Sequence, residues 1–297
     1  MRIETLLTGF LEAHKLHRTY IDIATQWFQP LSHRIALHQN DANRPILVAI
    51  HGSQGSGKTT LAAVLALLLE QLHHRNAIAL SIDDFYLTLA ERQQLAKNIH
   101  PLLATRGVPG THDMQLTLDT LQQLLHFNKA VQIPRFNKAR DDRFATTQWL
   151  KLDKPVDVII LEGWCLGCEP QSNDELRTPV NELERKRDID GRWRQYVNQQ
   201  IEQRYLELNK LADIWVMLKA PSFDCVYEWR LEQEQKLADQ HKQESNIMNA
   251  DQIAEFIQFY QRITEHCLVI LPPKMHFLFE LGRGRQIMRV TEPKTLA

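Results

Sequence analysis

The sequence has little of what would define several classes of protein. Its 297 residues include only four cysteines, too few for a scaffold of disulfide bonds in a chain of this length. Charges of one sign do not dominate, because 35 Lys and Arg residues stand against 36 Asp and Glu residues, for a net charge of −1. Domains that bind nucleic acid usually have a strongly basic face, so we expect no nucleic-acid partner.

Long apolar runs are also missing. The longest run, Leu61 to Leu69, is far shorter than the ~20 residues that cross a bilayer as a helix. Acidic and polar residues interrupt the first ten positions, where a signal peptide would need an apolar core. We therefore expect a cytoplasmic protein with no membrane partner, and the sequence gives no indication of its oligomeric state.

Two of the cysteines, Cys165 and Cys168, have the CxxC spacing that occurs in zinc and redox sites. A structural zinc site needs a second pair of ligands, and no second CxxC, HxxxH or Cys/His cluster supplies one. Reduced thiols fit the sequence better than a metal or redox site.

The pattern of apolar residues predicts an α/β fold. Between residues 6 and 28 apolar side chains recur every three or four positions, which predicts amphipathic helices that end before Pro30. Short apolar runs predict strands at 46–50, 77–82, 131–133, 156–161, 214–218, 267–271 and 276–281. Helices are predicted at 59–72, from a Thr88/Glu91 capping box onward, and at 114–125, 197–208, 222–242 and 253–263, the last capped by Asn249 or Asp251. This alternation predicts a mostly parallel sheet with helices on both faces.

We divide the chain into an N-terminal helical extension, residues 1–44, and one α/β domain, residues 45–297. Within that domain, residues 165–195 are polar, contain two prolines and show no period. We expect this stretch to be an insertion or a mobile loop.

Residues 52–59 read Gly-Ser-Gln-Gly-Ser-Gly-Lys-Thr and match the GxxxxGK[ST] phosphate loop in full. The glycines let backbone N–H groups turn inward on phosphate oxygens, and the next helix adds its positive N-terminus. Lys58 is expected to reach the β- and γ-phosphates, and the Thr59 hydroxyl to bind Mg²⁺. A buried strand before the loop and a helix after it favour the P-loop NTPase fold over a glycine-rich turn with no ligand. We expect ATP and Mg²⁺ as cofactors, with a nucleotide site made of Gly52, Ser53, Gln54, Gly55, Ser56, Gly57, Lys58, Thr59 and Thr60.

Three carboxylates end two of the predicted strands. Asp83 and Asp84 follow the second strand, and Glu162 ends the strand at 156–161. In an open α/β sheet this edge faces the ligand, where a carboxylate can orient an attacking hydroxyl or support a metal. Adjacent residues on an extended chain point apart, so only one of the two aspartates is expected to face the phosphate. The alternative for this pair is a polar strand end that caps a helix. Thr59, Asp83 and Glu162 are the candidate metal ligands.

Two further segments are suited to hold an anionic substrate. Residues 134–143 are dense in Arg and Lys, and residues 106–113 form a turn-rich approach to a helix. The alternative is a solvated charged loop. Arg230, in a late charged helix, is a candidate lid arginine that closes over the γ-phosphate, and its alternative is a surface salt bridge to Glu234.

Together these segments resemble the D-glycerate 3-kinase family over about residues 44–290. The resemblance rests on GSQGSGKT, SIDDFYLT, RGVPGTHDM, PRFNKARDDR, LEGWCLG and APSFDCVYEWRLEQE. The chain is more distantly similar to pantothenate kinase, uridine kinase and phosphoribulokinase.

The resemblance implies roles for individual residues. Asp83 would accept the proton of the substrate hydroxyl, and Glu162 would support the metal. The catalytic set it implies is Lys58, Asp83, Glu162 and Arg230. The expected acceptor site is lined by Asp84, Tyr86, Arg106, His112, Asp113, Arg135, Lys138 and Arg143.

The function implied is that of an ATP-dependent small-molecule kinase. It would transfer the γ-phosphoryl group to a hydroxyl of a small carboxylated metabolite, with D-glycerate as first choice. Two alternatives stay open: a kinase for pantothenate, a nucleoside or a sugar phosphate, and a nucleotide-binding regulator or ATPase with no small acceptor. The aspartates beside a basic segment argue against the regulator, because a hydrolytic switch needs no acceptor clamp.

Overall fold

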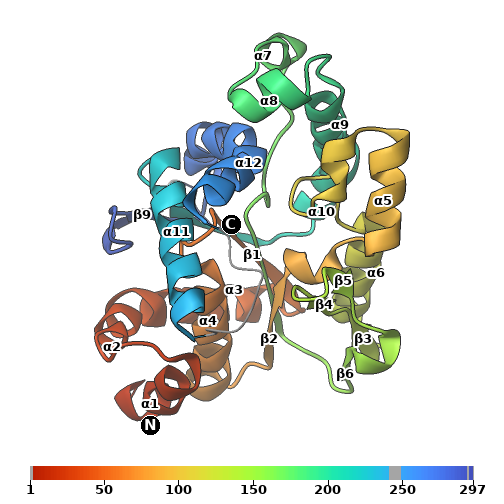
Figure 1. Ribbon diagram of the computed structural model, residues 1–297. Helices are drawn as coiled ribbons and strands as arrows, with labels where there is room; N and C mark the ends of the chain where they lie inside the picture. The colour runs from red at the N-terminus through yellow and green to blue at the C-terminus, as the bar shows by residue number, and fades with distance from the viewer. Residues whose placement is uncertain (1–2, 241–248, 293, 297) are drawn as a thin grey trace.

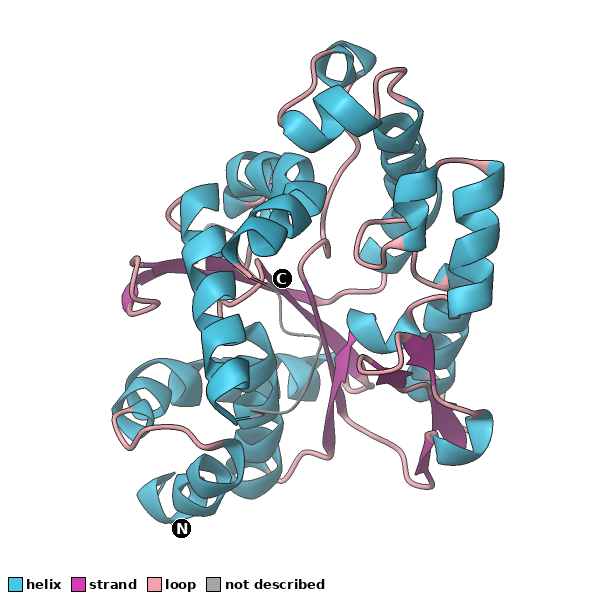
Figure 2. Ribbon diagram, viewed as in Figure 1, coloured by secondary structure: helices cyan, strands magenta, loops and turns pink. Residues whose placement is uncertain are grey.

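The computed structural model describes residues 3–240, 249–292 and 294–296. A six-stranded sheet lies at its centre with helices on both faces (Figures 1 and 2). In spatial order its strands are β10 (Ile287–Thr291), β9 (Phe277–Leu281), β8 (Ile214–Lys219), β1 (Ile46–Gly52), β7 (Val158–Gly163) and β2 (Ala77–Ser81). All neighbours are parallel except β10, which runs antiparallel to β9 at one edge. The predicted α/β class with a mostly parallel sheet is confirmed.

Strand β1 shows why both faces of the sheet are covered. Its side chains alternate between the two faces, and all are buried. Leu47 and Ala49 belong to one apolar core, whereas Ile46, Val48 and Ile50 belong to the other. The first core is completed by α6 (Met114–Leu125), α9 (Arg192–Gln200) and α12 (Ala250–Ile270), and the second by α4 (Lys58–His73) and α11 (Phe223–Gln240).

The N-terminal helices pack into the second core. They are α1 (Ile3–His14), α2 (Tyr20–Ile23), a π-helical turn (Ala24–Phe28) and α3 (Gln29–Ala42). The Phe28 ring lies 6.3 Å from the Phe279 ring of β9, and in Figure 1 these helices gather beside α4. The boundary at residue 45 stays a prediction, because these helices share their core with α4 and the sheet.

The predicted helix end before Pro30 is wrong. Pro30 lies in the first turn of α3, and helical structure continues from Tyr20 to Ala42. Proline is tolerated there because the first turn needs no N–H donor, and the preceding π-helical turn already departs from the regular bonding pattern.

The stretch at 165–195 is also more regular than predicted. It contains α7 (Asn173–Arg177) and α8 (Glu182–Arg187) and then enters α9. These helices are only one or two turns long, so no period was visible in the sequence. Ser172 and Glu175 form a capping box at the start of α7.

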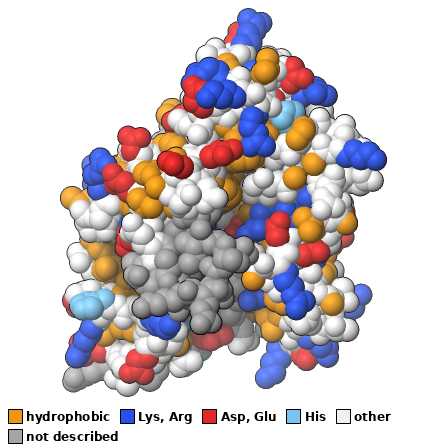
Figure 3. Space-filling model, viewed as in Figure 1, with side chains coloured by type: hydrophobic (Ala, Val, Ile, Leu, Met, Phe, Trp, Pro, Cys, Tyr) orange, Lys and Arg blue, Asp and Glu red, His pale blue; other side chains and the backbone are white. Residues whose placement is uncertain are grey.

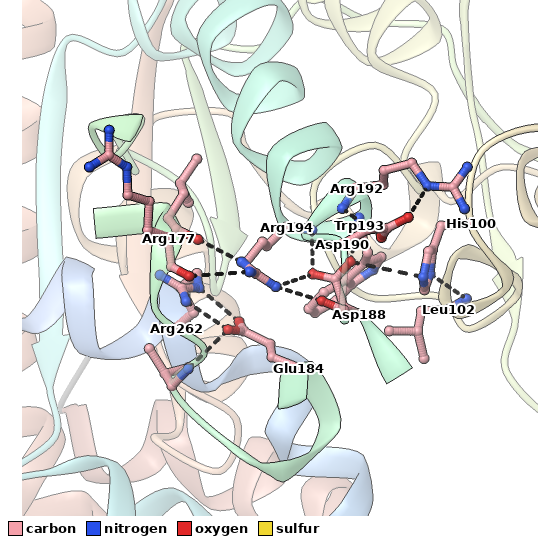
Figure 4. Close-up of polar contacts among 12 residues, drawn as sticks. His100, Leu102, Arg177, Glu184, Asp188, Asp190, Arg192, Trp193, Arg194 and Arg262 are labelled. Atoms are coloured by element: carbon pink, nitrogen blue, oxygen red, sulfur yellow. Dashed lines mark hydrogen bonds and ion pairs between the residues drawn. The ribbon is translucent and has the colours of Figure 1, made fainter. Parts of the chain in front are cut away.

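Two buried ion pairs hold this insertion in place (Figure 4). Arg262 of α12 donates from Nε and Nη2 to the Glu184 carboxylate at 2.7 and 2.6 Å. Arg194 of α9 donates to Asp188 Oδ2 at 2.8 Å. Both carboxylates are fully buried and bonded, so these pairs tie the stretch to α9 and α12.

One predicted strand is part of a helix. Residues 267–270 belong to α12, where Ile263 and Cys267 keep the helical spacing on its buried face. Asn249 caps this helix, accepting from the Gln252 N–H at 2.9 Å, so Asp251 is not the cap. The end of the helix predicted at 222–242 lies outside the described residues. None of the described helices is long and apolar enough to cross a membrane.

The remaining predicted elements are confirmed within one or two residues at most ends. They include α5 (Leu89–Asn98), which begins at the predicted capping box of Thr88 and Glu91. The predicted 197–208 helix spans the end of α9, a π-helical turn (Ile201–Tyr205) and α10 (Leu206–Asn209). Beside the sheet lie two small antiparallel pairs, β3 (Val131–Ile133) with β6 (Leu150–Leu152) and β4 (Phe136–Asn137) with β5 (Asp142–Arg143).

Candidate active site

The candidate site lies where three parallel strands end. The phosphate loop follows β1, the aspartate pair follows β2, and Glu162 lies near the end of β7 between them. Ser81 of β2 and Ile50 of β1 are both in register with Glu162. Because the carboxyl ends of parallel strands meet at one edge, the three predicted acidic and phosphate-binding segments come together there.

Two glycines give the phosphate loop its shape. Gly55 (φ +77°) and Gly57 (φ +91°) have left-handed backbones, which side chains rarely adopt. A Cβ on Gly55 would lie 2.6 Å from Trp229 Cβ, whereas a Cβ on Gly57 would meet nothing within 4 Å. The open side of the loop is therefore at Gly57, where α4 begins with Lys58, Thr59 and Thr60.

The loop also leaves polar groups unused. Ser53 Oγ, Gln54 Oε1 and Ser56 Oγ are buried and have no hydrogen-bond partner among the described residues. Unpaired buried polar atoms are costly unless a ligand or water satisfies them. Together with the free N–H groups at the start of α4, they fit phosphate oxygens.

Glu162 connects the loop to β7. It is 3% exposed and accepts a hydrogen bond from the Thr59 hydroxyl at 2.8 Å. Lys58 Nζ lies 3.9 Å from its Oε2, an atom that has no hydrogen-bond partner among the described residues. A buried carboxylate beside a hydroxyl offers the oxygen ligands that Mg²⁺ prefers.

Asp83 lies in a 3₁₀ turn, Ile82–Phe85, rather than at an extended strand end as the sequence suggested. Its Oδ2 accepts from Lys138 Nζ at 2.7 Å, and its Oδ1 accepts from the Tyr86 hydroxyl at 3.0 Å. Burial alone raises the pKa of Asp83, but the charges of Lys138 and Lys58 outweigh it and lower the pKa to about 2. Asp83 is therefore a carboxylate throughout the neutral range.

Asp84 has different partners. It accepts the Phe136 N–H at 3.1 Å, and Arg135 lies 3.9 Å from its Oδ2. Burial raises the pKa of Asp84. These bonds anchor the β4–β5 hairpin beside the site.

The basic residues divide into two groups. Arg143 donates to the Tyr86 carbonyl at 2.9 and 3.2 Å and to Asp113 at 3.2 Å, and Arg106 pairs with Asp141. These two guanidinium groups brace neighbouring segments, and Asp113 also caps α6.

Lys138 and Arg135 are more accessible, with 63% and 56% of their side chains exposed, against 13% for Arg143. Basic and acidic side chains are interspersed over the face seen in Figure 3. The predicted acceptor-binding residues are thus close together, but only part of the set is open to a ligand.

Two other candidates lie against aromatic rings. His112 is 4% exposed and stacks on Tyr86 at 4.3 Å between ring centroids. The Arg230 guanidinium lies over the Phe256 ring at 5.5 Å. The side chain of Glu234, the alternative partner of Arg230, lies outside the described part of the chain.

The CxxC cysteines are buried and free of disulfide bonds. Burial raises the pKa of Cys165 well above its usual value, which disfavours the thiolate that metal binding and redox chemistry require.

Sequence reasoning missed residues that support the phosphate loop from the far end of the chain. Arg285, after β9, donates to the Gly55 carbonyl at 2.8 Å. Trp229 of α11 packs against Gly55 and donates from its indole to the Arg283 carbonyl at 2.7 Å. A Gly-Arg-Gly-Arg run at 282–285 marks a turn. Nothing in the sequence shows that this turn lies beside the loop.

Comparison with known proteins finds relatives among kinases. The chloroplastic D-glycerate 3-kinase of Arabidopsis thaliana is 34% identical over 215 residues, which cover 68% of this chain and 44% of the plant protein. The uncharacterized kinase mug58 of Schizosaccharomyces pombe is 34% identical over 242 residues, covering 78% of this chain and 84% of the yeast protein. No protein-family model matches the chain.

A solved structure agrees with these relatives. The D-glycerate 3-kinase of Cryptococcus neoformans superposes with a TM-score of 0.73 at 25% identity, and the match covers 88% of this chain and 99% of that one. The chain belongs to the D-glycerate 3-kinase family. The family assignment suggested by the sequence motifs is confirmed, and it makes the chain a phosphotransferase of the P-loop kinase class.

Proposed function

We propose that this D-glycerate 3-kinase family member transfers the γ-phosphoryl group of ATP to a hydroxyl of a small carboxylated acceptor, with D-glycerate as the first acceptor to test. The observation that carries the proposal is the meeting of the phosphate loop, Glu162 and Asp83 at one sheet edge, beside Lys138. We keep the cytoplasm as its proposed location.

The nucleotide half of the reaction is assigned to the loop. Backbone N–H groups of residues 53–59, the start of α4 and Lys58 would hold the phosphates. Thr59 and Glu162 would hold Mg²⁺, with Asp83 nearby, and the unpartnered Glu162 Oε2 fits that use. When bound, the cation neutralises charge on the phosphates.

Asp83 is assigned to the acceptor hydroxyl. A carboxylate with a pKa near 2 is a weak base, so its main action is to accept a hydrogen bond and aim the hydroxyl oxygen. Phosphoryl transfer passes through a loose transition state in most analyses, in which positioning contributes more than early removal of the proton. As the new P–O bond forms, the bond from the γ-phosphorus to the β–γ bridging oxygen would break and release ADP, and the hydroxyl proton would move to an Asp83 oxygen.

Lys138 and Arg135 are assigned to the carboxylate of the acceptor, because they are the more exposed of the basic residues beside Asp83. Arg143 and Arg106 would shape the site through their bonds to Tyr86 and Asp141. Arg230 keeps its proposed role as lid arginine.

An ADP-release assay with a panel of acceptors tests the proposal. The panel contains D-glycerate, L-glycerate, pantothenate, uridine and a sugar phosphate, and ³¹P NMR identifies the product. We expect D-glycerate to give the highest kcat/KM. Faster turnover of another acceptor would assign this protein to that acceptor, and slow ADP release that no acceptor changes would favour the regulator or ATPase.

A matched pair of lysine variants links the assay to the site. Lys138→Ala should raise the acceptor KM about tenfold, because a charge-assisted hydrogen bond is lost. Lys151→Ala is the control, because Lys151 is similarly exposed and pairs with Asp153 away from Asp83. Equal effects of the two variants would remove Lys138 from the acceptor site.

A further inference from the structure

A buried pair of side chains, His112 and Tyr205, lies behind the acceptor residues. Tyr205 ends the π-helical turn Ile201–Tyr205 and is fully buried. Its hydroxyl oxygen lies 2.6 Å from His112 Nδ1, and the two rings meet edge to face at 6.0 Å. π-helical turns inside helices are frequent at functional sites, and this one places the Tyr205 hydroxyl on His112.

The chemistry of the two groups assigns a direction to this contact. The buried Tyr205 hydroxyl needs an acceptor for its hydrogen. The acceptor within reach is His112 Nδ1. A neutral histidine that accepts at Nδ1 carries its hydrogen on Nε2. Burial lowers the pKa of His112 to about 4, which keeps the ring neutral in the physiological range.

The other nitrogen of His112 is unused. His112 Nε2 is buried and has no hydrogen-bond partner among the described residues. The ring stacks on Tyr86 with 21° between the planes, and a β-bridge joins the backbones of these two residues. Tyr86 in turn donates to Asp83, whose charge acts on His112. The unpartnered N–H therefore belongs to the same cluster as the carboxylate assigned to the acceptor hydroxyl.

We propose that His112 donates a hydrogen bond from Nε2–H to an oxygen of the acceptor, and that Tyr205 is a positioning residue that holds His112 in this tautomer. The ligand is a hydroxy acid with an oxygen besides the one that is phosphorylated. This inference rests on the proposed function, and it adds a neutral donor to a set in which the other assigned donors are cationic.

Glycines at 107 and 110 support the arrangement. A Cβ on Gly110 would lie 2.7 Å from a Tyr196 ring carbon, and one on Gly107 would lie 2.3 Å from the Tyr260 hydroxyl. The segment thus fits closely between α9 and α12, and this close packing fixes the position of His112 relative to Tyr205.

Two substitutions of His112 separate the donor role from a packing role. The amide nitrogen of Gln reaches roughly the place of Nε2, whereas that of Asn lies near the place of Nδ1. His112→Gln should keep the acceptor KM within about threefold of wild type, and His112→Asn should raise it about tenfold or more, the range for one lost hydrogen bond to a charged oxygen. The KM for ATP should be unchanged in both variants. Equal acceptor KM values for the two variants would overturn the proposal.

Tyr205→Phe tests the positioning role. Removing the hydroxyl frees His112 to place its hydrogen on either nitrogen, so the acceptor KM should rise about threefold to tenfold. The value of kcat at saturating acceptor should change less. An unchanged acceptor KM in folded Tyr205→Phe would remove Tyr205 from this role.

Nitrogen-15 NMR of the histidine rings supplies a readout that needs no acceptor. The His112 signals, assigned by their loss in His112→Gln, should show the Nε2–H tautomer in the wild-type protein at pH 7. A protonated Nδ1 would contradict the proposal even if every kinetic result agreed. If the acceptor panel finds no substrate while the tautomer is as expected, the proposed function fails and the Tyr205–His112 assignment stands.

Discussion

The two sides of the site are built in different ways. The phosphate side is a nearly continuous segment, residues 52–60, supported by Glu162 on the neighbouring strand. The proposed acceptor side draws single residues from separate segments: Asp83 and Tyr86 after β2, His112 before α6, and Lys138 from the β4–β5 hairpin. A continuous segment brings its own geometry wherever it occurs, whereas the acceptor side exists only once the whole fold has formed.

The largest expected effect separates these two sides. Lys58→Ala and Asp83→Asn should each lower kcat by about 10³-fold, the upper range for loss of one group that acts on the transition state. Lys58→Ala should also weaken the affinity for magnesium–ATP, and Asp83→Asn should leave it nearly unchanged. Isothermal calorimetry beside turnover measures both, and loss of nucleotide affinity in Asp83→Asn would mean that the two sides are not separable.

Around the 165–195 stretch, substitutions of arginines should change the stability of the fold. Arg262→Met leaves the Glu184 carboxylate buried without its partner, so it should lower the free energy of unfolding by about 3–5 kcal/mol. Arg187→Met is the control, since Arg187 pairs with Glu255 on the surface and should cost less than about 1 kcal/mol. Urea denaturation measures both values. Equal costs would show that the buried pair does not hold the insertion.

Acid should destabilise the acceptor side through His112. Its pKa is about 4 in the folded protein, below the usual 6.5, so the unfolded chain binds more protons between these values. Stability is therefore complete above pH 6.5 and falls as the pH drops toward 4, by at most about 3 kcal/mol for this residue. His51, also buried with a pKa of about 4, adds to the loss in the same window. Thermal melting between pH 6.5 and pH 4 should show a smaller loss of stability in His112→Gln than in the wild type. If the two proteins lost the same stability over this range, His112 would not be a source of the acid destabilisation.

The smallest expected effects are on stability, for alanine substitutions at two glycines of the phosphate loop. Gly55→Ala should lower the free energy of unfolding by about 2 kcal/mol, because its Cβ meets Trp229 as well as a strained backbone. Gly57→Ala adds only the backbone strain, about 1 kcal/mol, but its Cβ enters the open space where phosphate would lie. Gly57→Ala should therefore weaken nucleotide binding more than Gly55→Ala does, although it lowers the free energy of unfolding less. If Gly55→Ala weakened nucleotide binding more, the open side of the loop would lie elsewhere.

The difference between contiguous and scattered residues also explains which features could be predicted from the sequence. The sheet, most helices and the phosphate loop followed from local patterns, because periodicity and glycine spacing are properties of contiguous residues. Asp83 and Glu162 were predicted as acids that follow or end strands, and the structure has Glu162 in β7 but Asp83 in a 3₁₀ turn after β2. The strand predicted at 267–271 failed because the apolar run that suggested it also fits the buried face of α12.

Partners distant in the sequence could not be inferred from it. Arg262 and Glu184 are 78 residues apart, and Tyr205 and His112 are 93 residues apart. Each pair depends on how helices pack, which no local pattern encodes. The family resemblance supplied candidate residues on the acceptor side, but not which of them, such as Arg143 and Asp113, are already paired with each other.

The bond from Arg285 to Gly55 spans 230 positions of the chain. During synthesis the phosphate loop emerges well before Arg285, so the Gly55 carbonyl lacks this donor while the 230 positions between them are being made. A growing chain therefore carries a complete nucleotide-binding motif long before it carries a complete nucleotide site. Truncations that remove only the last strand and its preceding turn would leave the motif in the sequence and take away one of its supports.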